Sequence, residues 1–584
     1  MPSKETGSMI AATAIQKQLR PSTFAFLLLY SIALSASIIA SKHVIIAGGE
    51  YSTADVNRIS PYGYNDLALF ALVTVLLLVI GTLVLALLFP SPKASDEQDA
   101  TFEALRLKRK PIILMSIALF VLYVPYLLAY WPGLIFSDSI ASLSQSLGFT
   151  AYNNHHPLAF TLCVKACLFI AHMFDLSNSA GYALFSITQI AFLSLCFAIS
   201  IQWVMQRTKC RRIWRLALLA FFGLPPYFAT YTIAMWKDPL FSAGILILSL
   251  LTFDLIASKG RILKLEKAWL PTFVLACLAT ALLRSNGILV IMALAAALIV
   301  LSLRKQDSCK KPAITATSIA IAALLVTGPV FSALGVIPAA KAESIGIPLN
   351  QMARVAATDG AMSDDDARYL NDILPLDLYK TVYAPTCVNS LKWNSAFNEE
   401  ALSTGFWQHW LSLGVKNPIS YLESWELQTV GYWSVNQPQV LAYSANISTG
   451  VPHNIYDKES LETWGIFPQN KLGNDGVFSL FRIDRRFIPI GWLVWFALFA
   501  ALALFNSRKT VWIISLIPTA AIVAALLIAS PIWYWERYAV ALQFLLPFYV
   551  SVLVCARNAK QSTCSNEAKM LKDNQIRDVK PGKH

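Results

Sequence analysis

The chain has 584 residues, of which 56% are hydrophobic and only 14% are charged. This composition excludes an ordinary soluble globular protein and is typical of membrane proteins. The formal net charge of +13 is compatible with a nucleic-acid partner, but the Lys and Arg residues lie in short clusters between apolar segments, as the positive-inside rule predicts. We therefore expect a multi-pass protein of the cell membrane that contacts the lipid bilayer and no nucleic acid.

Apolar segments long enough to cross a bilayer, which takes about 20 helical residues, recur along the chain. They lie near 23–46, 67–90, 111–131, 180–204, 213–231, 239–257, 268–304, 313–333, 487–505, 510–530 and 537–556. The segment 268–304 is long enough for two short helices broken at 284–287. The sequence thus predicts an all-α polytopic fold with about 12 transmembrane helices.

One further apolar segment, 157–174, is ambiguous. If it crossed the membrane, the basic cluster at 207–212 and every later cluster would lie on the wrong side for the positive-inside rule. We therefore expect this segment, which contains Lys165 and His172, to lie in the membrane interface or dip into it. Both termini are then cytoplasmic.

This topology divides the chain into five parts. They are 1–110, a cytoplasmic tail with two extra transmembrane helices; 111–337, a seven-helix module with the first outer loop at 132–179; 338–486, a mainly helical extracytoplasmic domain; 487–557, three transmembrane helices; and 558–584, a basic cytoplasmic tail. Within the outer domain, Ser363 is expected to cap a helix that has three Asp residues in its first turn, and 418–433 is expected to be helical.

Asp138 is the first candidate for chemistry. It lies at the membrane edge of the first outer loop, in a stretch, 131–157, without Lys or Arg. A carboxylate in this position can have its pKa tuned by its neighbours and can accept a proton from an attacking hydroxyl. The alternative is that Asp138 caps a helix that starts near Ser139.

The same loop ends in the motif NNHHP, which contains Asn154, His155 and His156. The two histidines could bind phosphate or orient an acceptor, but adjacent histidines lack the i, i+4 spacing of helical metal ligands. We therefore expect no metal site from this pair alone. The residue before the proline could also simply mark the end of the loop.

Several ionisable residues lie at the outer boundary of later apolar segments. Lys237 and Asp238, in TIAMWKDPLF, either pair with each other, or the ammonium contacts a phosphate and the carboxylate a sugar hydroxyl or a metal. Arg284 either binds a phosphate or extends to the interface. Arg537 either binds a phosphate or pairs with Glu536.

The order and outer placement of WPGLIFSDSI, NNHHP, TIAMWKDPLF, LLRSNG, IPLNQMARV and ERYAV resemble a bacterial branch of the GT-C superfamily, integral membrane glycosyltransferases that use polyprenyl-phosphate-linked sugars. The resemblance covers residues from 111 to about 545. It implies a GT-C-like fold, an active site on the outer face, and inverting transfer of a sugar to a cell-envelope acceptor.

The resemblance also implies roles for individual residues. Asp138 would be the general base, and Lys237, Asp238 and Arg284 would be donor or phosphate contacts. Beside these, we expect Arg354 and Arg537 as further donor or phosphate contacts, and Asn154, His155, His156 and Gln351 as acceptor or substrate contacts. No second acid stands beside Asp138, which departs from the acid pair of the family and leaves a divalent cation, Mg or Mn, an open question.

Two other functions remain open at this point. A transporter or flippase of lipid-linked glycans would place ionisable groups near the bilayer midplane, whereas here they cluster at the outer boundary. An ATP-driven transporter is disfavoured because the sequence has no Walker-type glycine loop. A ligase or polymerase of whole glycans would differ from a single-sugar transferase in ways that these motifs do not separate.

Overall fold

The computed structural model describes residues 19–49, 51–91, 106–304, 306–436, 481, 487–529 and 536–577. In these residues the protein is all-α apart from one short hairpin, so the expected helical architecture is confirmed. The predicted continuation of the outer domain through 437–480 and 482–486 lies outside the described residues.

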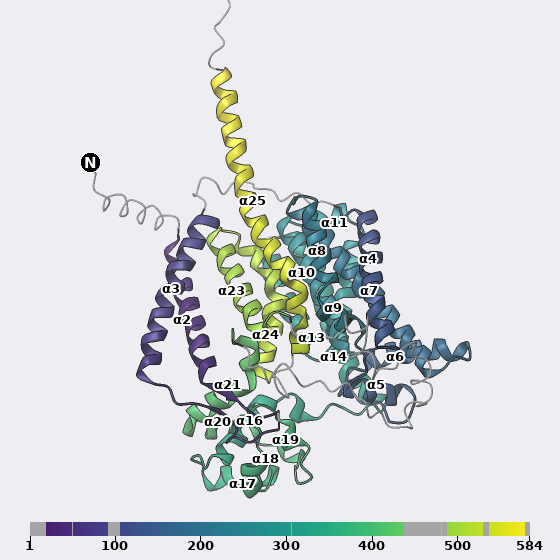
Figure 1. The fold of residues 1–584 in the computed structure, drawn as a ribbon, viewed down its shortest axis with the longest axis vertical. Helices are drawn as coiled ribbons and strands as arrows, with labels where there is room; N and C mark the ends of the chain where they lie inside the picture. Colours follow the sequence, from purple (N-terminus) through teal and green to yellow (C-terminus); the bar gives the residue numbers. More distant parts are fainter. Residues whose placement is uncertain are drawn as a thin grey trace, which may run out of the picture.

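Most helices run along one bundle (Figure 1). In chain order, the helices outside the compact group described below are α2 (Pro21–His43), α3 (Tyr64–Leu88), α4 (Arg109–Ala129), α5 (Ser137–Ser146), α6 (Leu158–Met173), α7 (Asn178–Arg207), α8 (Ile213–Gly223), α9 (Pro226–Ile233), α10 (Lys237–Ala257), α11 (Ile262–Leu265), α12 (Trp269–Leu283), α13 (Gly287–Leu303), α14 (Lys310–Leu325), α15 (Phe331–Ala333), α23 (Ile490–Asn506), α24 (Ile517–Ala529) and α25 (Val540–Arg577). Of these, α6 projects sideways from the bundle (Figure 1).

Among the described residues, eight helices are long and apolar enough to cross a membrane, or nine if the bent pair α8 and α9 is one span. The protein is therefore a multi-pass membrane protein. Three more of the expected spans fall on shorter apolar helices, α12, α13 and α23. Whether these three cross the bilayer stays a prediction.

The expected break at 284–287 is confirmed, since α12 ends at Leu283 and α13 begins at Gly287. A Cβ atom on Gly287 would lie 1.7 Å from the carbonyl oxygen of Thr280, so only glycine allows the two helices to approach this closely. The turn between the helices holds Arg284 at a helix end, where its side chain reaches neighbouring elements.

The segment 213–231 departs from the expected single straight helix. It forms α8 and α9, which are bent by 56° relative to each other. The adjacent Pro225 and Pro226 explain the break: Pro226 has no N–H for the helical ladder and disfavours the helical conformation of the residue before it. The proline pair was a usable signal in the sequence.

Figure 1 shows a compact group of helices at one end of the bundle, which we call the domain end. This group contains the 3-10 helix η4 (Lys341–Glu343) and the helices α16 (Gly346–Ala357), α17 (Asp364–Ile373), α18 (Tyr379–Val382), α19 (Asn389–Lys392), α20 (Phe406–Lys416) and α21 (Pro418–Trp433). The group has its own core, which includes Leu349, Met352, Leu370 and Leu413. The predicted cap is confirmed, since the Ser363 side chain accepts a hydrogen bond from the Asp366 N–H.

A short antiparallel hairpin of β1 (Val44–Ile46) and β2 (Asn57–Ile59) follows α2 and contacts α21. The sequence analysis did not predict it, because strands of three residues carry almost no periodic signal. The hairpin attaches the N-terminal helices to the domain end.

The opposite end of the bundle, which we call the basic end, contains α11 (Figure 1). Three of the basic clusters expected in the cytoplasm meet there. Arg106 pairs with Glu266 at 3.1 Å, and the Gln206 side chain donates to the Arg106 carbonyl at 3.1 Å. The clusters thus lie together, while the side of the membrane that they face stays a prediction.

Candidate active site

Backbone pairing joins the loop 132–179, which we expect on the outer side and continue to call the first outer loop, to the start of α10. The Leu134 N–H donates to the Ile233 carbonyl at 2.9 Å, and the Met235 N–H donates to the Leu134 carbonyl at 2.9 Å. The Ser139 hydroxyl also donates to the Met235 carbonyl at 2.7 Å. These bonds fix the first turn of α5 beside the first turn of α10.

The aromatic rings of Phe136 and Trp236 stack at the same junction, with centroids 3.9 Å apart. Both residues immediately precede their helices. Asp138 lies in the first turn of α5, and the Ser139 hydroxyl accepts the Phe136 N–H at 3.1 Å. Asp138 is therefore not the cap of a helix that starts near Ser139, and its carboxylate is directed to other partners.

Three cationic or basic groups surround the Asp138 carboxylate. Oδ2 lies 2.8 Å from Arg537 Nη1, 3.5 Å from Lys237 Nζ and 3.9 Å from His156 Nδ1. Lys237 Nζ also lies 2.9 Å from His156 Nδ1. These four residues come from distant parts of the sequence, and the structure brings them together as one group, which we call the Asp138 cluster.

The Asp138 cluster is largely buried, since the side chain of Arg537 is 5% exposed and that of Asp138 is 19% exposed. Burial alone raises the pKa of Asp138, but the charges of Arg537, Lys237 and His156 outweigh it and hold this pKa well below its usual range. Burial, together with Lys237, lowers the pKa of His156. At neutral pH the cluster therefore holds an ionised carboxylate and a neutral imidazole.

A second ion pair lies next along α10. Asp238 is fully buried, and its Oδ1 lies 2.9 Å from Arg284 Nη1. Lys237 and Asp238 therefore each pair with a residue from another segment. Separating a buried ion pair would leave two uncompensated charges, which is costly. The Arg284–Asp238 pair therefore holds the α12–α13 turn against α10.

Tyr538, which the sequence analysis did not select, joins the two ion pairs. It belongs to the 3-10 helix η10 (Glu536–Ala539). Arg284 donates to the Tyr538 carbonyl at 3.1 Å and lies over the Tyr538 ring at 4.5 Å. Arg537 donates to the Tyr538 hydroxyl at 3.2 Å and lies over the Trp236 ring at 5.0 Å. Such cation–π contacts keep guanidinium groups in place in a water-poor site.

Glu343 was also missed by the sequence analysis. Its Oε1 lies 3.6 Å from His155 Nδ1, and it pairs closely with Lys392. A backbone bridge supports this contact, since the Asn154 N–H donates to the Ile337 carbonyl at 2.8 Å. Because Glu343 lies in η4, its contacts connect the Asp138 cluster to the domain end, which no local motif could have revealed.

The remaining predicted residues have structural partners. Arg354 pairs with Glu423 of α21. Gln351 donates to the Tyr421 carbonyl at 3.1 Å and accepts the Trp410 indole N–H at 2.9 Å. The side-chain oxygen of Asn154 accepts from the Leu158 N–H at 3.5 Å. These contacts hold α16 against α20 and α21 and hold the start of α6.

The Asp138 cluster is a poor fit for a divalent cation. Its one carboxylate already faces the charges of Arg537 and Lys237, which would repel Mg²⁺ or Mn²⁺. Across the described part of the chain, no group of three or more His, Cys, Asp or Glu residues could hold a metal ion.

The arrangement suits an anionic ligand. Three ion pairs combine three cations, Lys237, Arg284 and Arg537, with two carboxylates, so positive charge is in excess while His156 is neutral. Buried guanidinium and ammonium groups are strong partners for phosphate. The Asp138 carboxylate can accept a proton when Lys237 and Arg537 bind another anion instead.

Comparison with known proteins identifies a family whose function is unknown. Residues 148–568 match a family described as a family of unknown function (DUF6020). The matched region contains every predicted site residue except Asp138. No curated protein and no solved structure matches the chain. Because the match covers most of the sequence, this membrane protein belongs to the DUF6020 family of unknown function.

Proposed function

We propose that the protein is a membrane glycosyltransferase that moves a sugar from a polyprenyl-phosphate donor to a cell-envelope acceptor. The observation that carries the proposal is the Asp138 cluster, in which a carboxylate, two cations and a histidine from four segments meet in a buried site. Ionisable residues at membrane depth are costly to keep and usually mark a function.

In the proposed reaction, an acceptor hydroxyl attacks the anomeric carbon of the donor sugar. The bond from that carbon to the phosphate oxygen breaks, its electron pair leaves with the polyprenyl phosphate, and the hydroxyl proton passes to Asp138. Lys237, Arg284 and Arg537 supply the positive charge that stabilises the leaving phosphate. His155 and His156 lie beside Lys237 and are proposed to contact the acceptor.

Donor binding would also make Asp138 a better base. In the free protein Arg537 and Lys237 lie 2.8 and 3.5 Å from its carboxylate and depress its basicity. A bound phosphate competes for the same cations, so their hold on Asp138 weakens and its pKa rises. The base is then activated only when a donor is present.

The proposal extends to the arrangement in the membrane. We infer a GT-C-like fold of about 12 transmembrane helices, in which α12, α13 and α23 cross the bilayer in addition to the longer helices. The basic end would face the cytoplasm, together with both termini, and the Asp138 cluster would face the outside.

Transfer from a panel of radiolabelled polyprenyl-phosphate sugars to cell-envelope acceptors tests the proposal. Purified protein should transfer one of these sugars, and Asp138→Asn should lower the rate by at least about 100-fold, the usual contribution of a general base. Asp175→Asn is the matched control, because Asp175 is an exposed acid in the same outer loop, and it should keep the full rate.

Near-normal transfer by Asp138→Asn would remove Asp138 from the mechanism. A protein that binds the lipid-linked sugars, transfers none of them and instead moves them between leaflets would be a transporter, and the glycosyltransferase proposal would then be wrong.

A further inference from the structure

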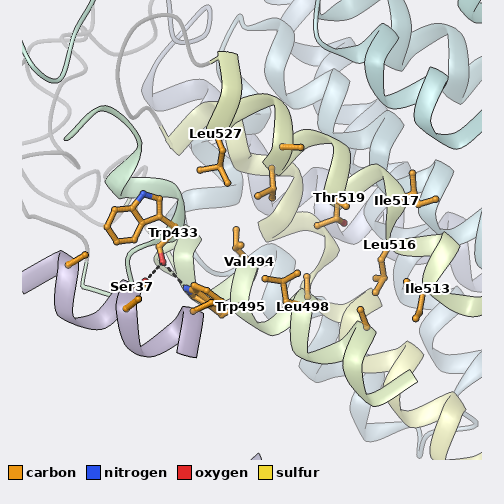
Figure 2. Close-up of a pocket in the computed structure, with 18 of the residues that line it drawn as sticks. Ser37, Trp433, Val494, Trp495, Leu498, Ile513, Leu516, Ile517, Thr519 and Leu527 are labelled. Atoms are coloured by element: carbon orange, nitrogen blue, oxygen red, sulfur yellow. Dashed lines mark hydrogen bonds between the residues drawn. The ribbon is translucent and has the colours of Figure 1, made fainter. Parts of the chain in front are cut away.

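A deep apolar groove runs between α2, α21, α23 and the segment of η9 (Thr510–Leu516) and α24, away from the Asp138 cluster. Its volume is about 770 Å³, within the usual range for sites that hold a small molecule. Figure 2 shows Leu527 at one part of the groove and Ile513 at another, with Val494, Leu498 and Thr519 between them.

Small residues create this space. Ala33, Ala36 and Ala40 line the groove from α2, and Ala520 and Ala524 line it from α24. Two of the walls, Pro21–His43 and Thr510–Ala529, are candidate membrane spans, so this part of the groove is bounded by helices that are long and apolar enough to cross the bilayer. An acyl chain is therefore the group that its apolar walls can bind.

One end of the groove has a different chemistry. Trp425, Trp433 and Trp495 line it there, close to Ser37 (Figure 2 labels Ser37, Trp433 and Trp495). Each indole N–H already has an acceptor: the Leu527 carbonyl at 2.8 Å, the Thr429 hydroxyl at 3.0 Å and the Trp433 carbonyl at 2.7 Å, respectively. The rings of Trp425 and Trp433 are parallel, with centroids 6.0 Å apart. A ligand at this end therefore meets aromatic rings whose N–H donors are already used.

Among the described residues that line the groove, Glu426, on α21, is the only charged one. Within the described residues, no hydrogen bond or ion pair to its carboxylate is found, whereas the neighbouring Glu423 pairs with Arg354. Burial and the negative charge of Glu423 raise the pKa of Glu426, while His43 at the end of α2 lowers it. A positive charge bound here would stabilise the ionised carboxylate.

We propose that the groove is a binding site for a phospholipid with an ethanolamine headgroup, whose ammonium contacts Glu426 and the three tryptophans while one acyl chain fills the apolar part. A carboxylate beside aromatic rings is the chemistry that recognises ammonium groups. The same carboxylate repels a lipid whose headgroup is only anionic, such as phosphatidylglycerol or a polyprenyl phosphate. This site is therefore independent of the proposed glycosyltransferase reaction.

Native mass spectrometry of the full chain tests this site. The detergent-solubilised protein is incubated with equal amounts of phosphatidylethanolamine and phosphatidylglycerol that have identical acyl chains. The wild type should retain about tenfold more phosphatidylethanolamine than phosphatidylglycerol. This is the ratio expected when phosphatidylglycerol lacks one ion pair or cation–π contact of about 1.4 kcal/mol. Glu426→Gln should remove this preference while some lipid still binds.

Two further variants separate the headgroup from the chain. Ala524→Phe should exclude both lipids, because the ring fills the part of the groove that the acyl chain occupies. Glu400→Gln, at an exposed acid of the outer domain, should leave the wild-type ratio unchanged. Equal retention of the two lipids by the wild type, an unchanged preference in Glu426→Gln, or undiminished binding in Ala524→Phe would each overturn the proposal.

Discussion

At the scale of single residues, the Asp138 cluster has two charge partners for one carboxylate. Arg537 and Lys237 both lie within 3.5 Å of Asp138 Oδ2, and Arg537 is also held by the Trp236 and Tyr538 rings. If the proposed donor phosphate binds these two cations, Asp138 is its internal competitor in the free protein. This competition has a measurable consequence that does not require sugar transfer.

We expect Asp138→Asn to bind a lipid phosphate about tenfold more tightly than the wild type, since the internal competitor for the two cations is removed. Lys237→Met should bind it about tenfold more weakly, because a charge-assisted hydrogen bond contributes about 1.5–3 kcal/mol. The measurement is isothermal titration of the purified protein with farnesyl phosphate, a short isoprenoid phosphate, in detergent.

Farnesol, which has the same chain and no phosphate, is the control ligand, and its affinity should be equal in all three proteins. Weaker binding of farnesyl phosphate by Asp138→Asn would show that the carboxylate helps to hold the ligand, for example through a bound cation, and would contradict the competition.

The sequence identified the members of the cluster for a physical reason. Asp138, Lys237 and Arg537 are ionisable residues at the borders of apolar segments, and such residues usually have partners and mark a function. Their partners could not be predicted, because the contacts join residues up to 399 positions apart. Glu343 and Tyr538 carry no local signal, and Arg354 and Gln351 gave a signal that the structure explains by contacts with α20 and α21.

At the scale of elements, α6 differs from the other short apolar helices. α12, α13 and α23 have no charged residue within their bounds, whereas α6 contains Lys165, whose ammonium donates to the Tyr152 hydroxyl at 2.5 Å. A lysine at the centre of a span costs about 2.5–3.5 kcal/mol, but at the interface its stem lies on apolar surface with the charge in water. Figure 1 shows α6 beside α5 near the domain end.

We therefore expect both ends of α6 to lie on the outer side of the membrane. In a variant without the native cysteines, Leu176→Cys, just after α6, should react with a membrane-impermeant maleimide added outside intact cells. The Leu176 side chain is 46% exposed, so the thiol is accessible to the reagent.

A cysteine at Lys209, in the basic end, is the control, and should react only after the cells are opened. Labelling of the Leu176→Cys variant only from the cytoplasmic side would mean that α6 crosses the membrane, and the topology inferred for every later helix would be reversed.

The positions of most long helices were predictable from the sequence, because runs of apolar residues with charged residues at their borders mark membrane spans directly. The division of 213–231 into α8 and α9 follows from Pro225 and Pro226 and could have been predicted with more weight on proline. The hairpin at 44–59 could not, since its two strands have only three residues each and carry almost no periodic signal.

At the scale of the whole molecule, Glu343 connects the two parts of the protein. It lies at the start of the domain end and contacts His155 of the first outer loop, next to the Asp138 cluster, and Lys392 of α19. The Lys392 side chain is only 8% exposed, so its ammonium depends on this carboxylate for compensation. Loss of a buried ionic partner typically costs about 3–5 kcal/mol.

We expect Glu343→Gln to loosen the contact between the outer domain and the membrane part without unfolding either. Amide hydrogen exchange should become about 100-fold faster in 152–157 and 341–346, because a local opening that becomes easier by about 2.7 kcal/mol is populated 100-fold more often. Exchange in the α12–α13 turn, which Arg284 and Asp238 hold independently, should not change.

The double variant Glu343→Gln/Lys392→Met removes both charges of the pair and should exchange more slowly than Glu343→Gln in 341–346, since no unpaired ammonium is left buried. Glu400→Gln should match the wild type throughout. If exchange in 152–157 is the same in Glu343→Gln and wild type, the first outer loop is held by the membrane helices alone, through Ile337 and Lys237. The outer domain would then have no part in positioning His155 and His156.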